Sequence, residues 1–307
     1  MSSPASTPSP TSAALPFGRL TTAMITPFRA DGSLDLDAAQ KVAAHLVAGG
    51  NDALVLNGTT GEAPTTSDDE KVQIIRAVRE AVGDGVKLVA GVGTNDTAHT
   101  VECARQAEAA GADGLLVVTP YYNKPPQEGL RAHFTAVADA TGLPNMLYDI
   151  PGRAGVEIKT DTLIALAEHP RIVAVKDAKG DIAGTTKVLA NTDLFYYCGA
   201  DELNLASLAV GAVGIASVVA HVASREYRQL IDAVVAGDLA TAQQIDRRLV
   251  PAVEAIMTRT QGAIMVKAAL KLAGVIEHAT LRSPLVAATA EQVDWLTTDL
   301  KTAGLIA

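Results

Sequence analysis

Lys176 is the residue of this chain whose setting points most directly to chemistry. It follows the apolar run 172–175 and precedes Asp177-Ala-Lys-Gly180, so it stands at the end of a predicted buried strand. A lysine held there loses hydration, its pKa falls, and its neutral amine can attack a carbonyl carbon. A lone lysine at a strand end more often points into water, so the prediction depends on its neighbours.

The loop after the predicted strand 52–56 carries the run Asn57-Gly-Thr-Thr-Gly-Glu62. Its two glycines allow a tight turn in which the amides and hydroxyls of Thr59 and Thr60 converge on a small anion, such as a carboxylate. An ordinary Gly-Thr turn is the alternative. Glu62 is expected to orient this loop rather than to perform chemistry.

Further polar groups end the predicted strands 114–118 and 145–148. Tyr148 can relay protons to and from a carbonyl oxygen or an amine, or it packs in the core with its hydroxyl in water. Arg153 has the planar fork that suits a substrate carboxylate, or it is a surface arginine. Tyr122, on a proline-flanked loop, is an active-site element, a contact between subunits, or both.

Eight short apolar runs alternate with amphipathic helical patterns and would position these groups. The predicted strands are 20–25, 52–56, 87–90, 114–118, 145–148, 172–175, 194–198 and 213–218. Most are apolar throughout, which is typical of parallel strands buried on both faces. The order predicts an α/β fold, a (β/α)8 TIM barrel, with chemistry at the C-terminal ends of the strands. A doubly wound open sheet is the alternative, but no convincing GxGxxG follows the first strand.

The pattern changes at both ends of the chain. Residues 1–16 are rich in Ser, Thr, Pro and Ala and read as a disordered tail rather than a signal peptide. After residue 237 the pattern is wholly helical, with helices expected at 239–257, 262–272 and 291–303. We therefore expect a tail at 1–16, a catalytic barrel at 17–237 and a C-terminal helical region at 238–307.

Composition argues against several classes of function. The 307 residues include 25 basic and 34 acidic side chains, a net charge of −9, whereas nucleic-acid binding needs a basic face. No apolar run approaches the roughly 20 residues of a membrane span. The two cysteines suggest no disulfide framework, and a reducing cytoplasm is the expected compartment. The six histidines form no HxH, HExxH or Cys-His pattern, so no metal site is expected.

Four runs together resemble the dihydrodipicolinate synthase family, now called 4-hydroxy-tetrahydrodipicolinate synthases. They are Gly58-Thr-Thr-Gly-Glu62, Thr119-Pro-Tyr-Tyr-Asn-Lys-Pro125, Tyr148-Asp-Ile-Pro-Gly-Arg153 and Val175-Lys-Asp-Ala178. The resemblance extends from about Phe17 to the C-terminus and is strongest to the actinobacterial branch. The wider superfamily comprises class I aldolases and lyases that form a Schiff base with pyruvate, including N-acetylneuraminate lyase.

The resemblance implies a lyase that condenses pyruvate with L-aspartate 4-semialdehyde in diaminopimelate and lysine biosynthesis, without a metal or organic cofactor. It implies that Lys176 forms the imine with pyruvate, and that Thr59 and Thr60 hold the pyruvate carboxylate. Arg153 would bind the carboxylate of aspartate semialdehyde.

The same resemblance implies a proton relay and an oligomer. Thr60, Tyr148 and Tyr122 would form a hydroxyl relay, with Tyr122 contributed by the neighbouring subunit of a homotetramer built as a dimer of dimers. The backbone at Gly199 and at Ala216 would lie beside the bound substrates.

The chain departs from the family pattern at three places. Ala63 replaces the serine that usually follows the Gly-Thr-Thr-Gly-Glu run. Ala216 replaces a larger aliphatic residue and is expected to widen the pyruvate end of the pocket. Lysine-sensitive members use a histidine and a glutamate where this chain has Lys71 and His99. An incoming lysine ammonium would lose its carboxylate partner and meet a cation, so we expect weak or absent inhibition by lysine.

Two other functions stay open. The first is another pyruvate-dependent aldolase or lyase, acting on a sugar-acid or aromatic aldehyde substrate, with Ala216 as the reason to consider it. The second is a barrel that binds a small acid without turnover. Arg153, together with Tyr122, favours the biosynthetic synthase over sugar-acid lyases, because the second substrates of those lyases are polyhydroxylated.

Overall fold

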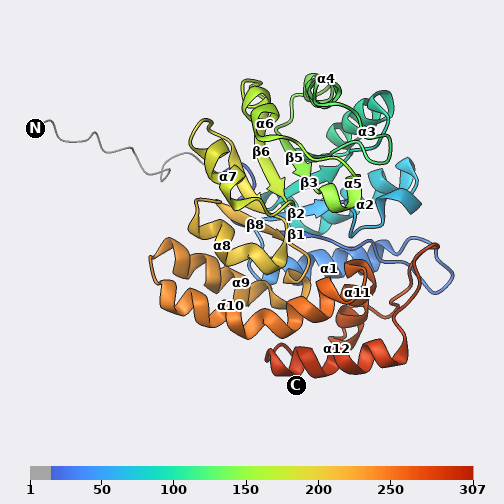
Figure 1. Ribbon diagram of the computed structural model, residues 1–307. Coiled ribbons are helices and arrows are strands. Elements are labelled where there is room, and N and C mark those ends of the chain that lie inside the picture. The colour runs from blue at the N-terminus through green and yellow to red at the C-terminus, as the bar shows by residue number, and fades with distance from the viewer. Residues whose placement is uncertain (1–14, 307) are drawn as a thin grey trace, which may run out of the picture.

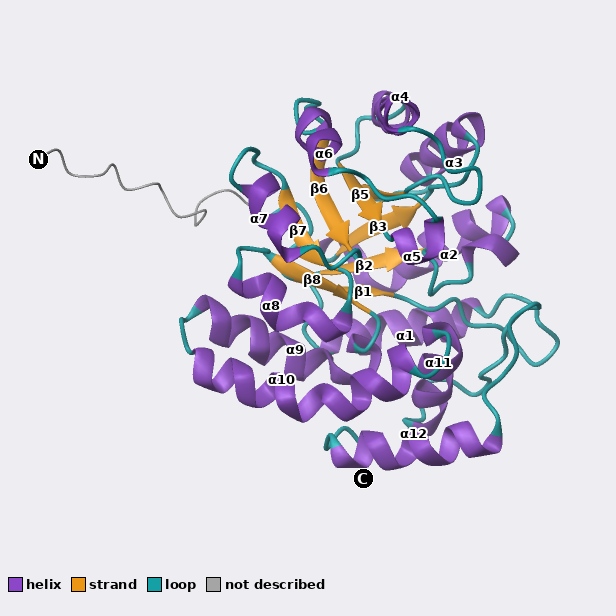
Figure 2. Ribbon diagram, viewed as in Figure 1, coloured by secondary structure: helices purple, strands orange, loops and turns teal. Residues whose placement is uncertain are grey.

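The protein is described here by a computed structural model, in which residues 15–306 are described, so residues 1–14 of the predicted tail lie outside the described part. Eight parallel strands form a closed barrel in which β8 pairs with β1 (Figures 1 and 2). The strands are β1 (Leu20–Ala23), β2 (Ala53–Leu56), β3 (Lys87–Gly91), β4 (Gly114–Val118), β5 (Asn145–Asp149), β6 (Ile172–Asp177), β7 (Phe195–Cys198) and β8 (Gly214–Ser217). The predicted TIM barrel is confirmed, and the open sheet is excluded.

Helices surround this barrel and connect each strand to the next (Figure 2). They are α1 (Leu36–Ala48), α2 (Asp68–Val82), α3 (Thr97–Ala109), α4 (Gln127–Asp139), α5 (Pro151–Ala154), α6 (Thr160–Leu166), α7 (Ile182–Leu189), α8 (Asn204–Ala209) and α9 (Ala220–Val235). Helix α2 shows the local rules clearly. The Ser67 hydroxyl accepts from the Glu70 amide, the Glu70 carboxylate accepts from the Ser67 amide, and Gly83 ends the helix at a φ of 64°.

Alternate residues of the strands face two separate apolar clusters, because successive side chains of a strand point to opposite sides. The interior of the barrel is filled by Phe17, Ala53, Val55, Val89, Leu116, Met146, Tyr148, Ala174, Tyr197 and Ala216. The other side of the sheet packs against the surrounding helices. A filled interior leaves the strand ends and their loops as the place for a site.

The chain ends in three further helices, α10 (Leu239–Val253), α11 (Gly262–Leu272) and α12 (Ala290–Thr302). Helix α10 packs along α9, and α12 packs on α10 and α11, so these helices form a second layer on one side of the barrel (Figure 1). In residues 15–306, no helix has both the length and the apolar character that crossing a membrane requires.

Candidate active site

Lys176 lies inside the barrel, one residue before the end of β6. Ala174 belongs to the interior cluster, and the two-residue period of a strand turns Lys176 the same way. The lysine is only 3% exposed. Its partners in the sheet register are Tyr148 on β5 and Tyr197 on β7. The predicted strand stopped at Val175, whereas β6 continues to Asp177, so the lysine is held by the sheet itself.

Burial makes the Lys176 amine a weaker base than an ordinary lysine. Desolvation lowers the pKa of Lys176 to about 8; the negative charge of Asp201 opposes this shift, and the positive charge of Arg153 adds to it. Its Nζ lies 4.5 Å from the centroid of the Tyr148 ring. An appreciable fraction of this amine is therefore neutral at mildly alkaline pH, which nucleophilic attack requires.

Gly199, the first residue after β7, makes room for the lysine side chain. A Cβ at this position would lie 2.8 Å from Lys176 Cγ and 2.9 Å from Lys176 Cε, closer than carbon atoms approach without a clash. The Gly199 amide also donates to the Asp177 carbonyl over 2.7 Å. Any larger residue at this position would displace the amine.

Tyr148 is a buried phenol whose neighbour from the Gly-Thr loop is Thr59. Burial raises the pKa of Tyr148 to about 12, while the charge of Arg153 and a hydrogen bond with the Thr59 side chain lower it. The phenol is thus protonated at neutral pH and available for proton transfer. The family resemblance implied Thr60 as this neighbour. In the structure Thr60 is 8% exposed, and it is Thr59 that contacts Tyr148.

The loops that follow β2 to β5, together with parts of α2 and α3, line an open cavity of about 1010 Å³. Thr59, Tyr122, Tyr148 and Arg153 all line it, so it brings together four of the predicted site residues. Lys176 does not line this cavity and reaches it through its contact with Tyr148. A volume of this size holds a small organic ligand with room to spare.

Backbone strain is concentrated in two loops at this end of the barrel. In residues 15–306 the non-glycine residues with a positive φ are Asn57, Glu62, Tyr122 and Lys124, which follow β2 and β4. Such conformations cost free energy and gather at functional sites. Tyr122, at a φ of 74°, is 86% exposed, and its amide donates to the Ala154 carbonyl. Its side chain therefore lies at the rim of the cavity and is largely in solvent.

Glu62 fixes the Gly-Thr loop to the C-terminal helices. Its carboxylate pairs with Lys267 on α11 and accepts from the Arg282 amide over 2.9 Å. Glu62 is 2% exposed and Lys267 is fully buried. The sequence analysis missed Lys267, although a single lysine within the apolar run 263–270 was a signal for a buried ion pair.

Asp201 makes a similar buried polar link, between the loop after β7 and the end of β8. Its buried carboxylate accepts from the Ser217 hydroxyl and from the amides of Val218 and Val219, at 2.8 and 3.1 Å. It thereby fixes the strand end that carries Ala216, which is fully buried in the barrel interior. The sequence analysis gave Asp201 no role.

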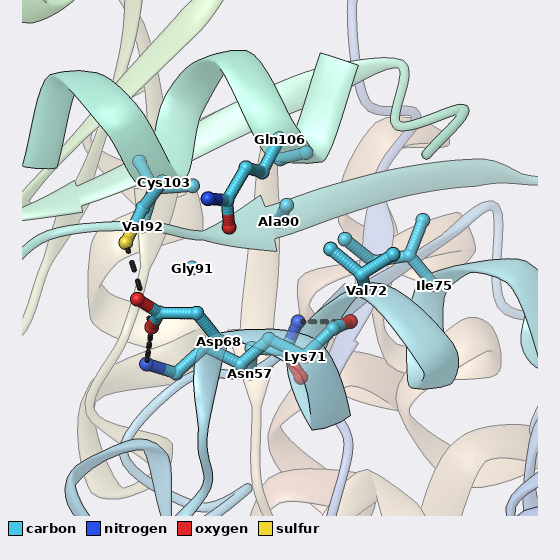
Figure 3. Close-up of a pocket in the computed structure, with 11 residues that line it drawn as sticks. Asn57, Asp68, Lys71, Val72, Ile75, Ala90, Gly91, Val92, Cys103 and Gln106 are labelled. Carbon is cyan, nitrogen blue, oxygen red and sulfur yellow. Dashed lines mark hydrogen bonds and ion pairs between the residues drawn. The ribbon is translucent and has the colours of Figure 1, made fainter. Parts of the chain in front are cut away.

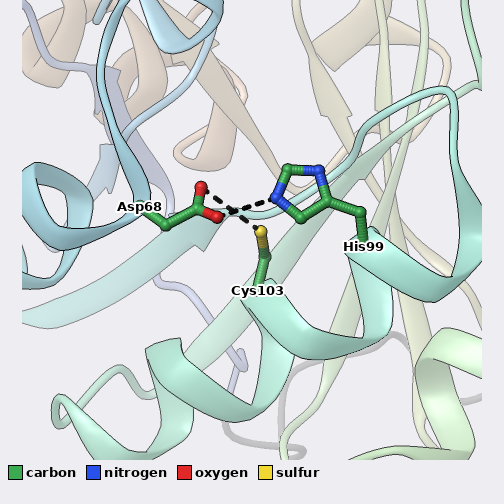
Figure 4. Close-up of side chains that lie close together, drawn as sticks. All are labelled: Asp68, His99 and Cys103. Atoms are coloured by element: carbon green, nitrogen blue, oxygen red, sulfur yellow. Dashed lines mark hydrogen bonds and ion pairs between the residues drawn. The ribbon is translucent and has the colours of Figure 1, made fainter.

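Lys71 and His99, the two positions at which the family resemblance implies a departure from lysine-sensitive members, meet at one carboxylate. Asp68 contacts Lys71 Nζ over 3.0 Å (Figure 3) and His99 Nε2 over 2.8 Å (Figure 4). These contacts hold the pKa of Asp68 below its usual value, with the His99 hydrogen bond as the largest favourable contribution. The nearby thiol of Cys103 has its pKa raised to about 11 by burial.

Comparisons with known proteins agree with this geometry. A model of the dihydrodipicolinate synthetase family matches residues 16–303. A 4-hydroxy-tetrahydrodipicolinate synthase from Kineococcus radiotolerans is 63% identical over 290 residues, which cover 94% of each chain.

Solved structures match over nearly the whole chain as well. The structure of a DHDPS from Cyanidioschyzon merolae with lysine bound is 38% identical, has a TM-score of 0.91, and covers 95% of this chain and 99% of its own. The chloride-inhibited dihydrodipicolinate synthase from Acinetobacter baumannii, complexed with pyruvate, is 34% identical, has a TM-score of 0.90, and covers 94% of this chain and 100% of its own. The resemblance in the sequence motifs is thus confirmed: the chain belongs to the dihydrodipicolinate synthetase family.

Proposed function

We propose that this protein is a 4-hydroxy-tetrahydrodipicolinate synthase, a lyase that condenses pyruvate with L-aspartate 4-semialdehyde in diaminopimelate and lysine biosynthesis. The observation that carries the proposal is the buried amine of Lys176, held 4.5 Å from the Tyr148 ring in a barrel whose 63% identical relative bears that name. A cytoplasmic location fits this role.

The first half of the reaction activates pyruvate. The neutral amine of Lys176 attacks the ketone carbon, and water leaves to give a protonated imine. The imine withdraws electrons, so the methyl carbon loses a proton and an enamine forms. Tyr148 and its neighbour Thr59 carry protons between these intermediates and the cavity.

The second half joins the two substrates. The enamine carbon attacks the aldehyde carbon, a carbon–carbon bond forms, and the aldehyde oxygen becomes a hydroxyl group. The amino group of aspartate semialdehyde then attacks the imine carbon, the ring closes, and the Lys176 amine leaves. The bond to the enzyme is thus formed and broken once in each turnover.

Two anion sites orient the substrates. We assign the pyruvate carboxylate to Thr59 and Thr60, where the tight Gly-Thr turn presents amides and hydroxyls, and the backbone at Gly199 and Ala216 to the walls beside it. Arg153 lines the cavity and is assigned to the second carboxylate, which suits its planar fork. This division places the aldehyde between the two anion sites, next to the enamine.

Tyr122 completes the relay in a homotetramer. Its exposed ring and its strained backbone support a role in a neighbouring subunit, because a φ of 74° at a tyrosine persists only where the surroundings need it. In this arrangement each active site depends on its partner, and the monomer is a poor catalyst.

The other two functions are not favoured. Relatives that match over most of the chain are named as the synthase rather than as sugar-acid or aromatic aldolases. A barrel that only binds acids would not need a desolvated lysine beside a protonated phenol.

Trapping of the imine tests the proposal. The protein is incubated with pyruvate, reduced with borohydride, digested and mapped by mass spectrometry. One reduced pyruvyl group is expected on the peptide that contains Lys176, and Lys176→Ala should abolish both the adduct and turnover of aspartate semialdehyde. Lys187→Met, which removes a half-exposed lysine of α7, is the matched control and should keep both. An adduct without turnover of aspartate semialdehyde would point to another aldolase, and full turnover by Lys176→Ala would refute the mechanism.

A further inference from the structure

A second group of reactive side chains lies between α2 and α3, on the wall of the large cavity but apart from the residues assigned to catalysis. His99 and Cys103 stand four residues apart and share one face of α3. Asp68, the first residue of α2, lies opposite them (Figure 4). Its carboxylate oxygens are 2.8 Å from His99 Nε2 and 3.8 Å from Cys103 Sγ. The three candidate ligand atoms all lie within 4.8 Å of one another.

We propose that Asp68, His99 and Cys103 form a binding site for a divalent transition-metal ion of the zinc type. A carboxylate, an imidazole and a thiolate are the side chains that Zn²⁺ takes, and three protein ligands leave the fourth position to water. Bonds of about 2.0–2.3 Å would set neighbouring ligand atoms roughly 3.3–3.7 Å apart in a tetrahedron. The three groups need to shift only slightly to surround an ion.

The surroundings supply room and a partner for that water. Asp68, Cys103 and Asn57 line a small cavity of about 10 Å³, which is close to the space of one water molecule (Figure 3). Among the described residues, the buried Oδ1 of Asn57 has no hydrogen-bond partner. Asn57 is part of the wall of that cavity, so this oxygen is a candidate acceptor for a water held there.

Lys71 is the group that competes with the ion. Its Nζ lies 3.0 Å from Asp68 Oδ1 and must leave when the metal binds. The side chain also lines the large cavity, so it has space to move. Binding forms a metal–sulfur bond, and the thiol proton of Cys103 leaves to solvent. The proposal does not depend on the aldol-type reaction.

Co²⁺ is the probe, because its absorption spectrum depends on which ligand atoms bind it. The full chain, reduced and freed of metal, is titrated with Co²⁺. One equivalent is expected to give a thiolate-to-cobalt charge-transfer band in the near ultraviolet and the intense visible bands of a tetrahedral ion, and Zn²⁺ should displace it. Cys103→Ser should remove the charge-transfer band, and His99→Gln should weaken binding at least about tenfold.

Matched controls come from the same chain. Cys198→Ser removes the other cysteine, and His169→Gln removes a histidine that pairs with Asp139 without a nearby cysteine, so both should leave the band unchanged. Lys71→Met should strengthen binding about fivefold, because a competing ion pair is lost. Such a gain cannot come from misfolding. No charge-transfer band, or a band that survives in Cys103→Ser, would overturn the proposal.

Discussion

At the scale of single residues, the central feature is an amine that the barrel keeps partly uncharged. Desolvation of Lys176 lowers its pKa, and the carboxylate of Asp201 limits the fall. The pKa of the neighbouring Tyr148 shifts in the opposite direction, because burial favours the neutral form of both groups. A neutral amine beside a protonated phenol is the combination that imine chemistry needs.

The pH dependence of imine formation follows from this shift. Below the pKa of about 8 the amine is mostly protonated, so the rate of trapping by borohydride at low pyruvate should rise about tenfold per pH unit and level off above pH 8. Trapping rates measured between pH 6 and 10 at constant ionic strength check this. A trapping rate that keeps rising until the pH reaches the pKa of a free lysine would contradict the effect assigned to the burial of Lys176.

Gly199→Ala should damage catalysis without unfolding the protein. The added methyl group would collide with Lys176 Cγ and Cε, and a displacement of the amine by about 1 Å is expected to lower kcat on the order of 100-fold. Gly85→Ala is the matched control, since a Cβ there meets nothing within 4 Å. Steady-state kinetics with circular dichroism distinguish the two variants. Unchanged kcat in Gly199→Ala would show that the lysine tolerates the contact.

Inhibition by lysine should be weak. The Asp68 carboxylate is already paired with Lys71 and His99, so no free anion is left on these three residues for an incoming ammonium. Turnover is expected to stay within about twofold across millimolar lysine. The double variant Lys71→His with His99→Glu introduces the residues that the resemblance implies for lysine-sensitive members and should gain sensitivity. Strong inhibition of the unaltered protein would refute this reading.

The sequence points to a single residue where a residue type has one plausible use, and it leaves the choice open where two neighbours have the same chemistry. Lys176 at a strand end was identified from the sequence, and the structure confirms its position in the barrel. The adjacent Thr59 and Thr60 are chemically identical, so only the path of the loop decides which one contacts Tyr148. The group of Asp68, His99 and Cys103 was missed because its members come from two helices, and the sequence does not reveal which sides of these helices face each other.

At the scale of elements, the sequence predicted all eight strands because each is an apolar run. Their ends were less certain, since tertiary contacts decide them. The strand predicted to reach Ile25 stops at Ala23, and the Ile25 amide donates instead to the buried imidazole of His221. The strand predicted to stop at Val175 extends to Asp177, because both of its neighbours continue the ladder.

The link between the Gly-Thr loop and α11 predicts a difference between two lysines of one helix. Lys267→Met leaves Glu62 as a buried charge without its cation, which should cost about 3–5 kcal/mol of unfolding free energy and raise KM for pyruvate. Lys271→Met, on the exposed face of α11, should change stability by less than about 0.5 kcal/mol. Urea unfolding and steady-state kinetics measure both. Equal effects of the two substitutions would show that the pair of Glu62 and Lys267 does not position the Gly-Thr loop.

At the scale of the whole molecule, the exposed ring of Tyr122 predicts active sites shared between subunits. Tyr122→Phe and Lys176→Ala should each be nearly inactive alone. Coexpressed chains would form mixed interfaces in which one site has both groups, so activity should recover to about a quarter of that of the unaltered protein. Sedimentation checks that the mixed sample is tetrameric. No recovery in a tetrameric mixture would mean that Tyr122 acts within its own chain.

The ion pair between Glu62 and Lys267 joins positions 205 residues apart in the chain. A nascent polypeptide must leave the ribosome as far as α11 before the carboxylate of Glu62 meets its cation, by which time every strand of the barrel has already been translated. The loop assigned to hold pyruvate is therefore among the last parts of the protein to reach its final conformation. Translation products that end before α11 should contain all eight strands but lack a correctly fixed pyruvate-binding loop.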